Sequence, residues 1–507
     1  MLVDYEYRSK KLLVSYIDDF GNIKLKYFPW TNPTKFIMCE DDDPDRNGKF
    51  VTWDGRNVKE IYTAHPNRYS VYDFLDKLPE EEKKEIFEYK EPNIFFIDIE
   101  NEVLEKKPQP ELAESAIQSI SVVNKDKVLV LGTKRITKEQ SDSIESGINN
   151  HFAKLKTNYQ FMYRYYESEY DMLLNFFKLM IPKMSVMTGW NFVQYDWVFL
   201  VNRCRKLGID PSIASFTGVL RESWLDIDKS EKPAHRIIVD YMELYQKWDT
   251  SVKVKESSAL DFVSDAVLGV KKVNYEGNLK YLYESDYQKF IMYNAIDSAL
   301  VQQIHEKMRY VDILYGISVL SKIRTLDAFN TLPVTEGILR GKMRDEKNVV
   351  FVKDDTKRDS EGEISSDMEV KGGWVKDPIV GMNAWTCCFD FASLYPTTMR
   401  QFNISADSYK GLVIKDRGKD VRDMIQKLHH EGGDVYSSFN GHKIKLEPDD
   451  IITLNGAVFK NEDGVVKDVM ADIYKERKKY KAMMMTANED LKELQNELAK
   501  LEKELNG

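Results

Sequence analysis

The chain has 507 residues, of which 42% are apolar and 31% are charged, and its formal net charge is −10. This composition excludes a generally disordered chain and argues against a protein whose whole surface coats nucleic acid. The length predicts about three domains. A nucleic-acid site in this chain would therefore be local, as a basic channel or as carboxylates gathered around metal ions.

The four cysteines are few and scattered, and no Cys-x-x-Cys spacing occurs among them. This pattern indicates reduced thiols and no zinc site. Charged residues close to the N-terminus are not typical of a signal peptide. No apolar run reaches the ~18 residues of a membrane-spanning helix. We therefore expect a cytoplasmic protein (in the host cytoplasm if it is phage-encoded) with no membrane contact.

Residues 1–92 predict a small α/β module without a catalytic signal. Segments 11–17 and 23–28 show strand-like patterns on either side of the turn signal at 19–22, which predicts a β-hairpin. The acidic stretch 40–45 is most simply a solvated loop.

The segment 93–100 is an apolar run that ends in Asp98-x-Glu100. Alternate residues of a strand face the same side, so the two carboxylates are expected to point together. Neighbouring carboxylates repel each other unless a cation lies between them. The pattern therefore indicates either a metal-binding strand or a buried strand that simply ends at a polar loop.

A second pair of strands, 116–123 and 127–131, continues an antiparallel meander. Segment 185–191 reads as another strand ending, and Asp196 opens a predicted helix over 197–207. Asp196 is either only an N-cap or a third acid at a strand-to-helix junction.

Segment 237–248 predicts a strand that passes into a helix, and 257–268 predicts a further helix. A long helical pattern covers 286–308. It carries Tyr293 and Asp297 four residues apart, and hence on one helix face. A phenol beside a carboxylate can orient a metal-held water, although the pair also fits a tyrosine and a surface acid.

These acids follow one another in a characteristic order. The sequence Phe-Ile-Asp-Ile-Glu at 96–100 resembles the first motif of the DEDDy 3′–5′ exonuclease domain of family B DNA polymerases. Residues 191–196 resemble its second motif, and Tyr293-x-x-x-Asp297 resembles its third. The resemblance implies an RNase H-like domain in which Tyr293 orients the attacking water. The implied ligands of two Mg²⁺ (or Mn²⁺) ions are Asp98, Glu100, Asp196 and Asp297.

Further along, the apolar run 384–389 predicts a buried strand that ends at Asp390. A small-residue turn follows, and Tyr395-Pro396 opens the next element. A carboxylate at a strand end can bind a divalent cation, and backbone N–H groups of a turn can bind phosphate oxygens. By itself, the segment also fits a buried strand that enters a loop and has no role in binding.

Asp390-x-x-Ser393-Leu394-Tyr395-Pro resembles the first palm motif of the same family, and residues 400–405 resemble its version in T-even-like bacteriophages. Residues 371–375 resemble the family's Gly-rich connection between exonuclease and palm. The resemblance implies that Asp390 binds metal and that the N–H groups of Ser393 and Leu394 bind the triphosphate. Tyr395 would stack under the sugar and exclude a 2′-hydroxyl.

Residues 475–481 carry five positive charges in seven residues. Arg477 and Lys481 lie four apart on one helix face, where they can bind the triphosphate of a nucleotide. This resembles the first fingers helix of the family. The alternative is a solvated charged face.

The family also has a Lys-x-x-x-Asn-Ser-x-Tyr-Gly helix and a Tyr-x-Asp-Thr-Asp hairpin, and the sequence contains neither. Asp390 alone cannot form a two-metal site, whose ions lie ~3.5–4 Å apart. We therefore predict the N-terminal subunit of a naturally split replicative polymerase, with a truncated piece of a longer polymerase chain as the alternative. A second polypeptide would supply the missing palm, fingers helix and thumb. A stripe of leucines at heptad spacing would pack on that polypeptide, on a second copy of this chain, or within the fingers. The stripe consists of Leu491, Leu494, Leu498, Leu501 and Leu505.

The expected fold is a multidomain α/β protein with an RNase H-like 3′–5′ exonuclease, an N-terminal domain and a partial palm and fingers. The expected domains are 1–93 with the return segment 310–363, the exonuclease at 94–309, the partial palm at 364–465 and the partial fingers at 466–507. The expected ligands are primer-template DNA, single-stranded 3′ ends and dNTP. Two alternatives are a standalone exonuclease with a vestigial palm and a nucleic-acid-binding regulator.

Overall fold

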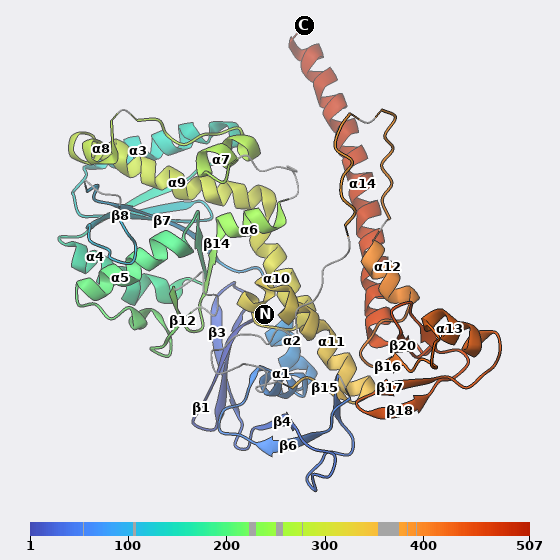
Figure 1. The fold of residues 1–507 in the computed structure, drawn as a ribbon. Helices are drawn as coiled ribbons and strands as arrows, with labels where there is room; N and C mark the ends of the chain where they lie inside the picture. Colours follow the sequence, from blue (N-terminus) through green and yellow to red (C-terminus); the bar gives the residue numbers. More distant parts are fainter. Residues whose placement is uncertain are drawn as a thin grey trace. The chain divides into compact units, whose positions relative to one another are not determined.

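The computed structural model describes the chain (Figure 1) except for residues 54, 105–107, 223–229, 250–256, 276, 353–374, 383, 392 and 507. The chain divides into two units. The first comprises Met1–Asn32 and Tyr72–Ile338, and the second comprises Pro33–Val71 and Leu339–Gly507. The domain boundaries expected from the sequence stay a prediction.

A six-stranded sheet forms the centre of the first unit, in the order β10-β9-β8-β7-β11-β14. Its strands are β7 (Ile94–Asn101), β8 (Ile117–Asn124), β9 (Lys127–Gly132), β10 (Gln160–Tyr165), β11 (Val186–Gly189) and β14 (Ile237–Asp240). The antiparallel meander β7-β8-β9 confirms the predicted strand pairs. β11 runs parallel to both β7 and β14, so these three strands end at the same edge of the sheet.

Helices cover both faces of this sheet (Figure 1). On one face, α9 packs against β7 and β8, with α3, α7 and α8 around it. The other face is covered by α4, two π-helical turns and α5, and its apolar core includes Phe176, Phe177, Trp197 and Phe199. The bounds are α3 (Lys138–His151), α4 (Glu169–Asn175), the π-helical turns Phe176–Met180 and Val193–Trp197, α5 (Val198–Lys206), α7 (Leu260–Leu268), α8 (Leu279–Ser285) and α9 (Tyr287–Met308). The predicted long helix over 286–308 is thereby confirmed.

The first unit also contains an antiparallel sheet of β1, β2 and β3, and the predicted hairpin at 11–28 is its β2–β3 pair. It further contains the helices α2, α6 and α10 and the strand pair β12–β13. The bounds are β1 (Leu2–Arg8), β2 (Lys11–Ile17), β3 (Ile23–Pro29), α2 (Glu80–Phe87), β12 (Leu220–Glu222), β13 (Glu231–Pro233), α6 (Tyr241–Trp248) and α10 (Tyr310–Ser321).

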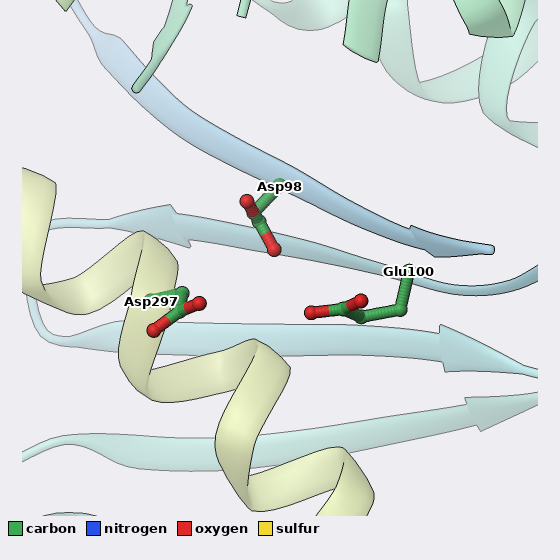
Figure 2. A group of neighbouring side chains, drawn as sticks. All are labelled: Asp98, Glu100 and Asp297. Atoms are coloured by element: carbon green, nitrogen blue, oxygen red, sulfur yellow. The ribbon is translucent and has the colours of Figure 1, made fainter. Parts of the chain in front are cut away.

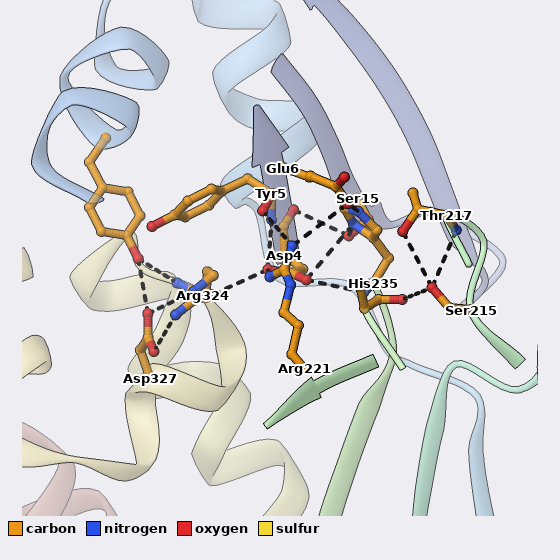
Figure 3. A network of polar contacts seen from close by, with 12 residues as sticks. Asp4, Tyr5, Glu6, Ser15, Ser215, Thr217, Arg221, His235, Arg324 and Asp327 are labelled. Carbon is orange, nitrogen blue, oxygen red and sulfur yellow. Dashed lines mark hydrogen bonds and ion pairs between the residues drawn. The ribbon is translucent and has the colours of Figure 1, made fainter. Parts of the chain in front are cut away.

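A buried polar network joins β1 to the segments near residues 235 and 324 (Figure 3). The Asp4 carboxylate lies 2.7 Å from Arg221 Nη1 and 3.2 Å from Arg324 Nη1, and it accepts a hydrogen bond from the backbone N–H of His235 at 3.1 Å. Burial alone would raise the pKa of Asp4, but Arg324 and Arg221 hold it below its ordinary value. The network therefore needs Asp4 as the ionised carboxylate.

The second unit is built around the sheet β18-β17-β16-β20-β19, with small pairs β4-β6 and β5-β15. Its bounds are β4 (Thr34–Met38), β5 (Val51–Thr52), β6 (Val58–Tyr62), β15 (Val349–Val350), α12 (Leu394–Gln401), β16 (Tyr409–Val413), α13 (Val421–His429), β17 (Tyr436–Phe439), β18 (His442–Lys445), β19 (Ile451–Ile452), β20 (Ala457–Phe459) and α14 (Val465–Asn506). Two helices contribute to both units, α1 (Arg68–Asp76) and α11 (Thr331–Lys347).

The long helix α14 is fixed at its first turn. The backbone N–H of Gly464 donates to Asn403 Oδ1 at 2.9 Å, and that of Val465 donates to Asp407 Oδ2 at 3.2 Å. Asn403 also donates to the carbonyls of Lys460 and Glu462, each at 2.7 Å. The segment 403–407 therefore holds the base of α14 against the sheet.

The predicted buried strand over 384–389 is wrong. This segment forms no strand, Trp385 has a φ of +57°, and the side chains of Trp385 and Phe389 are 99% and 92% exposed. A strand is stable only when a neighbour satisfies its backbone groups, and no strand of the described residues pairs with it. The predicted Gly-rich connection at 371–375 lies outside the described residues except for Val375.

No helix among the described residues combines the length and the apolar character needed to cross a membrane.

His305 on α9 generates a prediction about stability in acid. It is 2% exposed, and burial lowers its pKa from the ordinary 6.5 to about 3. The unfolded chain therefore binds a proton that the folded chain excludes, and stability falls as pH drops from about 6.5 toward 3. His305→Gln should flatten this loss by up to about 1.4 kcal/mol per pH unit, measured by urea unfolding across pH. The exposed His65→Gln serves as the control, and equal slopes for the two variants would contradict the assignment.

Candidate functional site

Three carboxylates from two elements meet at one face of the six-stranded sheet (Figure 2). Asp98 and Glu100 project from β7, and Asp297 projects from α9 toward them. One oxygen of each lies within 4.8 Å of the others. The strand alternation that places Asp98 and Glu100 on one face is therefore confirmed, and the packing of α9 on β7 supplies the third acid.

This cluster is electrostatically unfavourable on its own. Burial, reinforced by the neighbouring Asp297, raises the pKa of Asp98 to about 7. Burial and the surrounding acids also raise the pKa of Glu100, and burial raises that of Asp297. Like charges at this separation disfavour full ionisation, so the site favours positive charge.

Lys272 supplies one positive charge to the cluster. Its Nζ lies 2.6 Å from Asp297 Oδ2 and 5.1 Å from the centre of the Tyr293 ring. Burial by itself lowers the pKa of Lys272, but the Asp297 carboxylate raises it above its ordinary value, so the ammonium is charged.

The cluster also fits a divalent cation. Asp297 Oδ1 is buried and makes no hydrogen bond, so one carboxylate oxygen is available as a ligand. The donor set consists only of carboxylate oxygens, which are the ligands that Mg²⁺ and Mn²⁺ prefer.

Asn294 fixes the orientation of Asp98. Its Nδ2 donates to Asp98 Oδ2 at 2.7 Å, and its Oδ1 accepts from the Ser119 hydroxyl at 2.9 Å. Asn294 is fully buried. Because both ends of the amide are bonded, Asp98 is held in one rotamer against β7 and β8.

Asp196 lies beside the cluster but is not one of its three members. It is 5% exposed, in the π-helical turn Val193–Trp197, and its Oδ1 accepts a hydrogen bond from the backbone N–H of Ile99 at 3.0 Å. Burial and the Asp98 charge raise its pKa. The N-cap of α5 is Trp197, so Asp196 instead joins this turn to β7 between Asp98 and Glu100.

Tyr293 stands one helical turn before Asp297 on α9. Its side chain is 8% exposed, and burial raises its pKa, so the phenol keeps its proton. Its ring packs edge-on against Tyr275, with ring centres 5.2 Å apart. Tyr293 is thus a neutral hydrogen-bond donor beside the acids.

Two family models match the chain. The model of the DNA polymerase family B exonuclease domain covers residues 50–262, which include Asp98, Glu100 and Asp196. The model of DNA polymerase family B covers residues 332–500. The chain belongs to DNA polymerase family B.

Curated relatives of this family B chain come from phages and archaea. It is 26% identical over 335 residues to the DNA-directed DNA polymerase of Escherichia phage RB69, an overlap of 64% of this chain and 34% of that protein. The DNA-directed DNA polymerase of Enterobacteria phage T4 is 23% identical, over 64% of this chain and 34% of that protein. DNA polymerase 1 of Sulfurisphaera ohwakuensis is 25% identical, over 64% of this chain and 36% of the relative. The chain therefore spans about a third of the length of these relatives.

The residues expected in the polymerase site lie in the second unit. Asp390 is exposed in the segment before α12, Ser393 has a φ of +55° at the start of α12, and Tyr395 is 79% exposed. α12, which begins at Leu394, contacts α14. α14 carries Arg477 and Lys481, both exposed. Among the described residues, Asp390 belongs to no group of three possible metal ligands.

Sequence reasoning missed Lys272 and Asn294. Lys272 lies in the segment between α7 and α8, where no periodicity orients a side chain. A signal for Lys272 was that a buried cluster of acids needs a positive charge nearby. A signal for Asn294 was its position between Tyr293 and Asp297 on one helix.

Lys272→Met tests the charge balance of the site. Removing one partner of a buried ion pair leaves uncompensated charge, and we expect a loss of about 3–5 kcal/mol of stability without divalent cations. Mn²⁺ or Mg²⁺ should restore more stability to this variant than to the wild type, measured by urea unfolding with and without chelator. The control is Lys271→Met at the neighbouring lysine, which is 62% exposed. Equal losses in the two variants would contradict the proposed charge balance.

Proposed function

We propose that this family B chain is a metal-dependent 3′–5′ exonuclease that removes nucleotides from single-stranded DNA 3′ ends. The observation that carries the proposal is the convergence of Asp98, Glu100 and Asp297 within 4.8 Å. The orphaned Asp297 Oδ1 and the adjacent Asp196 support it. The match to the family's exonuclease domain supplies the reaction class.

The acids Asp98, Glu100, Asp196 and Asp297 would hold two divalent cations, with Mg²⁺ or Mn²⁺ favoured by the oxygen donors. Bound cations of this kind activate a water and stabilise the charge on the leaving 3′ oxygen. Tyr293 remains protonated, so its hydroxyl can donate to or orient the attacking water. Asn294 keeps Asp98 in one rotamer, and Lys272 reduces the repulsion among the acids before any cation binds.

Degradation of 5′-labelled single-stranded DNA tests the exonuclease. The wild-type chain with Mg²⁺ should shorten the DNA from its 3′ end. Asp98→Ala combined with Asp297→Ala should lower the rate by ~10³-fold or more, because the two replaced groups act as one unit. The matched control replaces two exposed acids, Asp42→Ala and Glu111→Ala, and should keep the wild-type rate. Activity that survives the first pair of substitutions would refute the assignment.

We further propose that the second unit contributes part of a nucleotidyl-transfer site. Asp390 would bind metal, the N–H groups of Ser393 and Leu394 would bind the triphosphate, and Tyr395 would stack under the sugar of dNTP. Arg477 and Lys481 would bind the triphosphate from α14. The contact between α12 and α14 and the family match over 332–500 support this assignment.

The exposed aromatic side chains around Asp390 support the completion of this site by further palm residues. Trp385, Phe389 and Phe391 are 78–99% exposed. A second polypeptide that supplies palm strands, a fingers helix and a thumb would cover these side chains. That this polypeptide exists stays a prediction from the sequence.

Capture of such a partner tests the polymerase half. Proteins that copurify with the chain are identified by mass spectrometry, and the reconstituted mixture is assayed for primer extension on primer-template DNA. We expect extension by the complex, loss of extension with Asp390→Ala, and no change in 3′–5′ degradation by that variant. Failure of every captured partner to give extension would favour a standalone exonuclease with a vestigial palm. Selective RNA affinity without metal-dependent cleavage would favour a regulator.

A further inference from the structure

Asp240 is a buried acid outside the cluster of Asp98, Glu100 and Asp297. It ends β14 and is 2% exposed. In the sheet its neighbour is Gly189, the last residue of β11, because the two parallel strands pair in that register. Asp240 therefore stands at the sheet edge where the chain leaves β11 toward Asp196.

The Asp240 carboxylate binds three backbone N–H groups from two different segments. Oδ1 accepts from Met242 in the first turn of α6 at 2.9 Å, and from Asn191 at 3.1 Å. Oδ2 accepts from Val193 at 3.1 Å. A helix cap alone needs only the bond to Met242. The other two bonds hold the turn that follows β11.

The backbone of this turn is restrained, so its N–H groups cannot easily move to another hydrogen-bond acceptor. Asn191 has a φ of +59°, in the left-handed region, which asparagine adopts more readily than most other non-glycine residues. Before it, a Cβ on Gly189 would lie 2.3 Å from the Ile97 carbonyl oxygen, so the turn starts in close contact with β7. Without Asp240, buried N–H groups of the turn would lose their acceptors, which is unfavourable.

The turn leads directly into the π-helical turn that carries Asp196. The N–H of Tyr195 donates to the Asn191 carbonyl at 3.1 Å, and that of Trp197 donates to the Phe192 carbonyl at 2.7 Å. At the far side, Asp196 Oδ1 accepts from the Ile99 N–H at 3.0 Å. The position of Asp196 beside β7 is thus fixed at both ends of a short segment, by Ile99 and by Asp240.

We propose that Asp240 is a positioning residue that holds Asp196 in register with Asp98 and Glu100, and so determines how strongly the site binds divalent cations. This inference rests on the proposed exonuclease function. Asp240 is not a member of the carboxylate cluster and would act on the site through the turn 191–193.

Asp240→Ser separates this role from helix capping. Serine can still cap α6 at the Met242 N–H, but its single hydroxyl cannot also bind Asn191 and Val193. Asp240→Asn is a milder second variant, which keeps the shape but turns one acceptor into a donor. The matched control is Glu243→Ala. It removes the exposed 3.0 Å bond that Glu243 Oε1 accepts from Gln194 Nε2, between the same two segments, and leaves residues 191–196 unchanged.

The test is a double-mutant cycle on the full chain with Asp240→Ser, Asp196→Ala and the two combined. Mn²⁺ binding without DNA is measured by calorimetry, and single-stranded DNA degradation is measured across a range of Mn²⁺ concentrations. We expect Asp240→Ser to weaken Mn²⁺ binding and to slow degradation at limiting Mn²⁺ by about 10- to 100-fold, as for residues that orient metal ligands. The combined variant should behave like Asp196→Ala alone, because both act on one ligand. Glu243→Ala should match the wild type.

Several outcomes would overturn the inference. Unchanged Mn²⁺ affinity in Asp240→Ser and Asp240→Asn would do so, as would losses that multiply in the combined variant. Reduced stability with normal Mn²⁺ affinity at temperatures where the variants are folded would show a merely structural role. A wild-type chain that binds Mn²⁺ but does not degrade DNA would refute the proposed exonuclease. In that case, weakened binding in Asp240→Ser would still support the positioning role.

Discussion

The candidate site of the first unit depends on one constraint. Carboxylates that repel each other are held close together in a buried site. Asp98 and Glu100 share a face of β7 because of strand geometry, and α9 brings Asp297 against them because its apolar residues pack on β7 and β8. The favourable burial of apolar side chains therefore holds acids at a separation that they would not adopt alone. Lys272 offsets part of the repulsion, and the remainder makes the site attractive to cations.

The surrounding polar groups form a second layer that orders this arrangement. Asn294 links Asp98 to Ser119 of β8, and Ile99 of β7 binds Asp196. Asp240 then connects the turn before Asp196 to β14 and α6. Asp98, Asp196 and Asp297 are thus each tied to a segment other than their own, so that the relative placement of these segments decides the geometry of the site.

Much of this site was predictable because strand and helix periodicities are local. Alternation on 94–100 placed Asp98 and Glu100 together, and the spacing of four placed Tyr293 and Asp297 on one helix face. The orientation of Asp196 depends on a π-helical turn, which leaves no signal in the sequence. Lys272 and Asp240 escaped notice because their roles depend on contacts between distant segments. The prediction of a strand over 384–389 was wrong for a related reason, since an apolar pattern cannot show whether a partner strand is present.

The anchored base of α14 has a mechanical consequence. A helix of 42 residues is about 63 Å long at 1.5 Å per residue. Asn403 and Asp407 hold its first turn. α12 packs against the helix, and the Arg400 guanidinium lies 5.7 Å from the Tyr474 ring centre. The side chains of residues 475–501 are all exposed. The helix is thus anchored over residues 464–474, and the part beyond Tyr474, about 48 Å long, extends from this anchor. A rotation of about 5° at Tyr474 would move the far end by about 4 Å for a rod of this length. Arg477 and Lys481 lie within two turns of the anchor and would move much less, so the packing of α12 on α14 keeps these two charges in place.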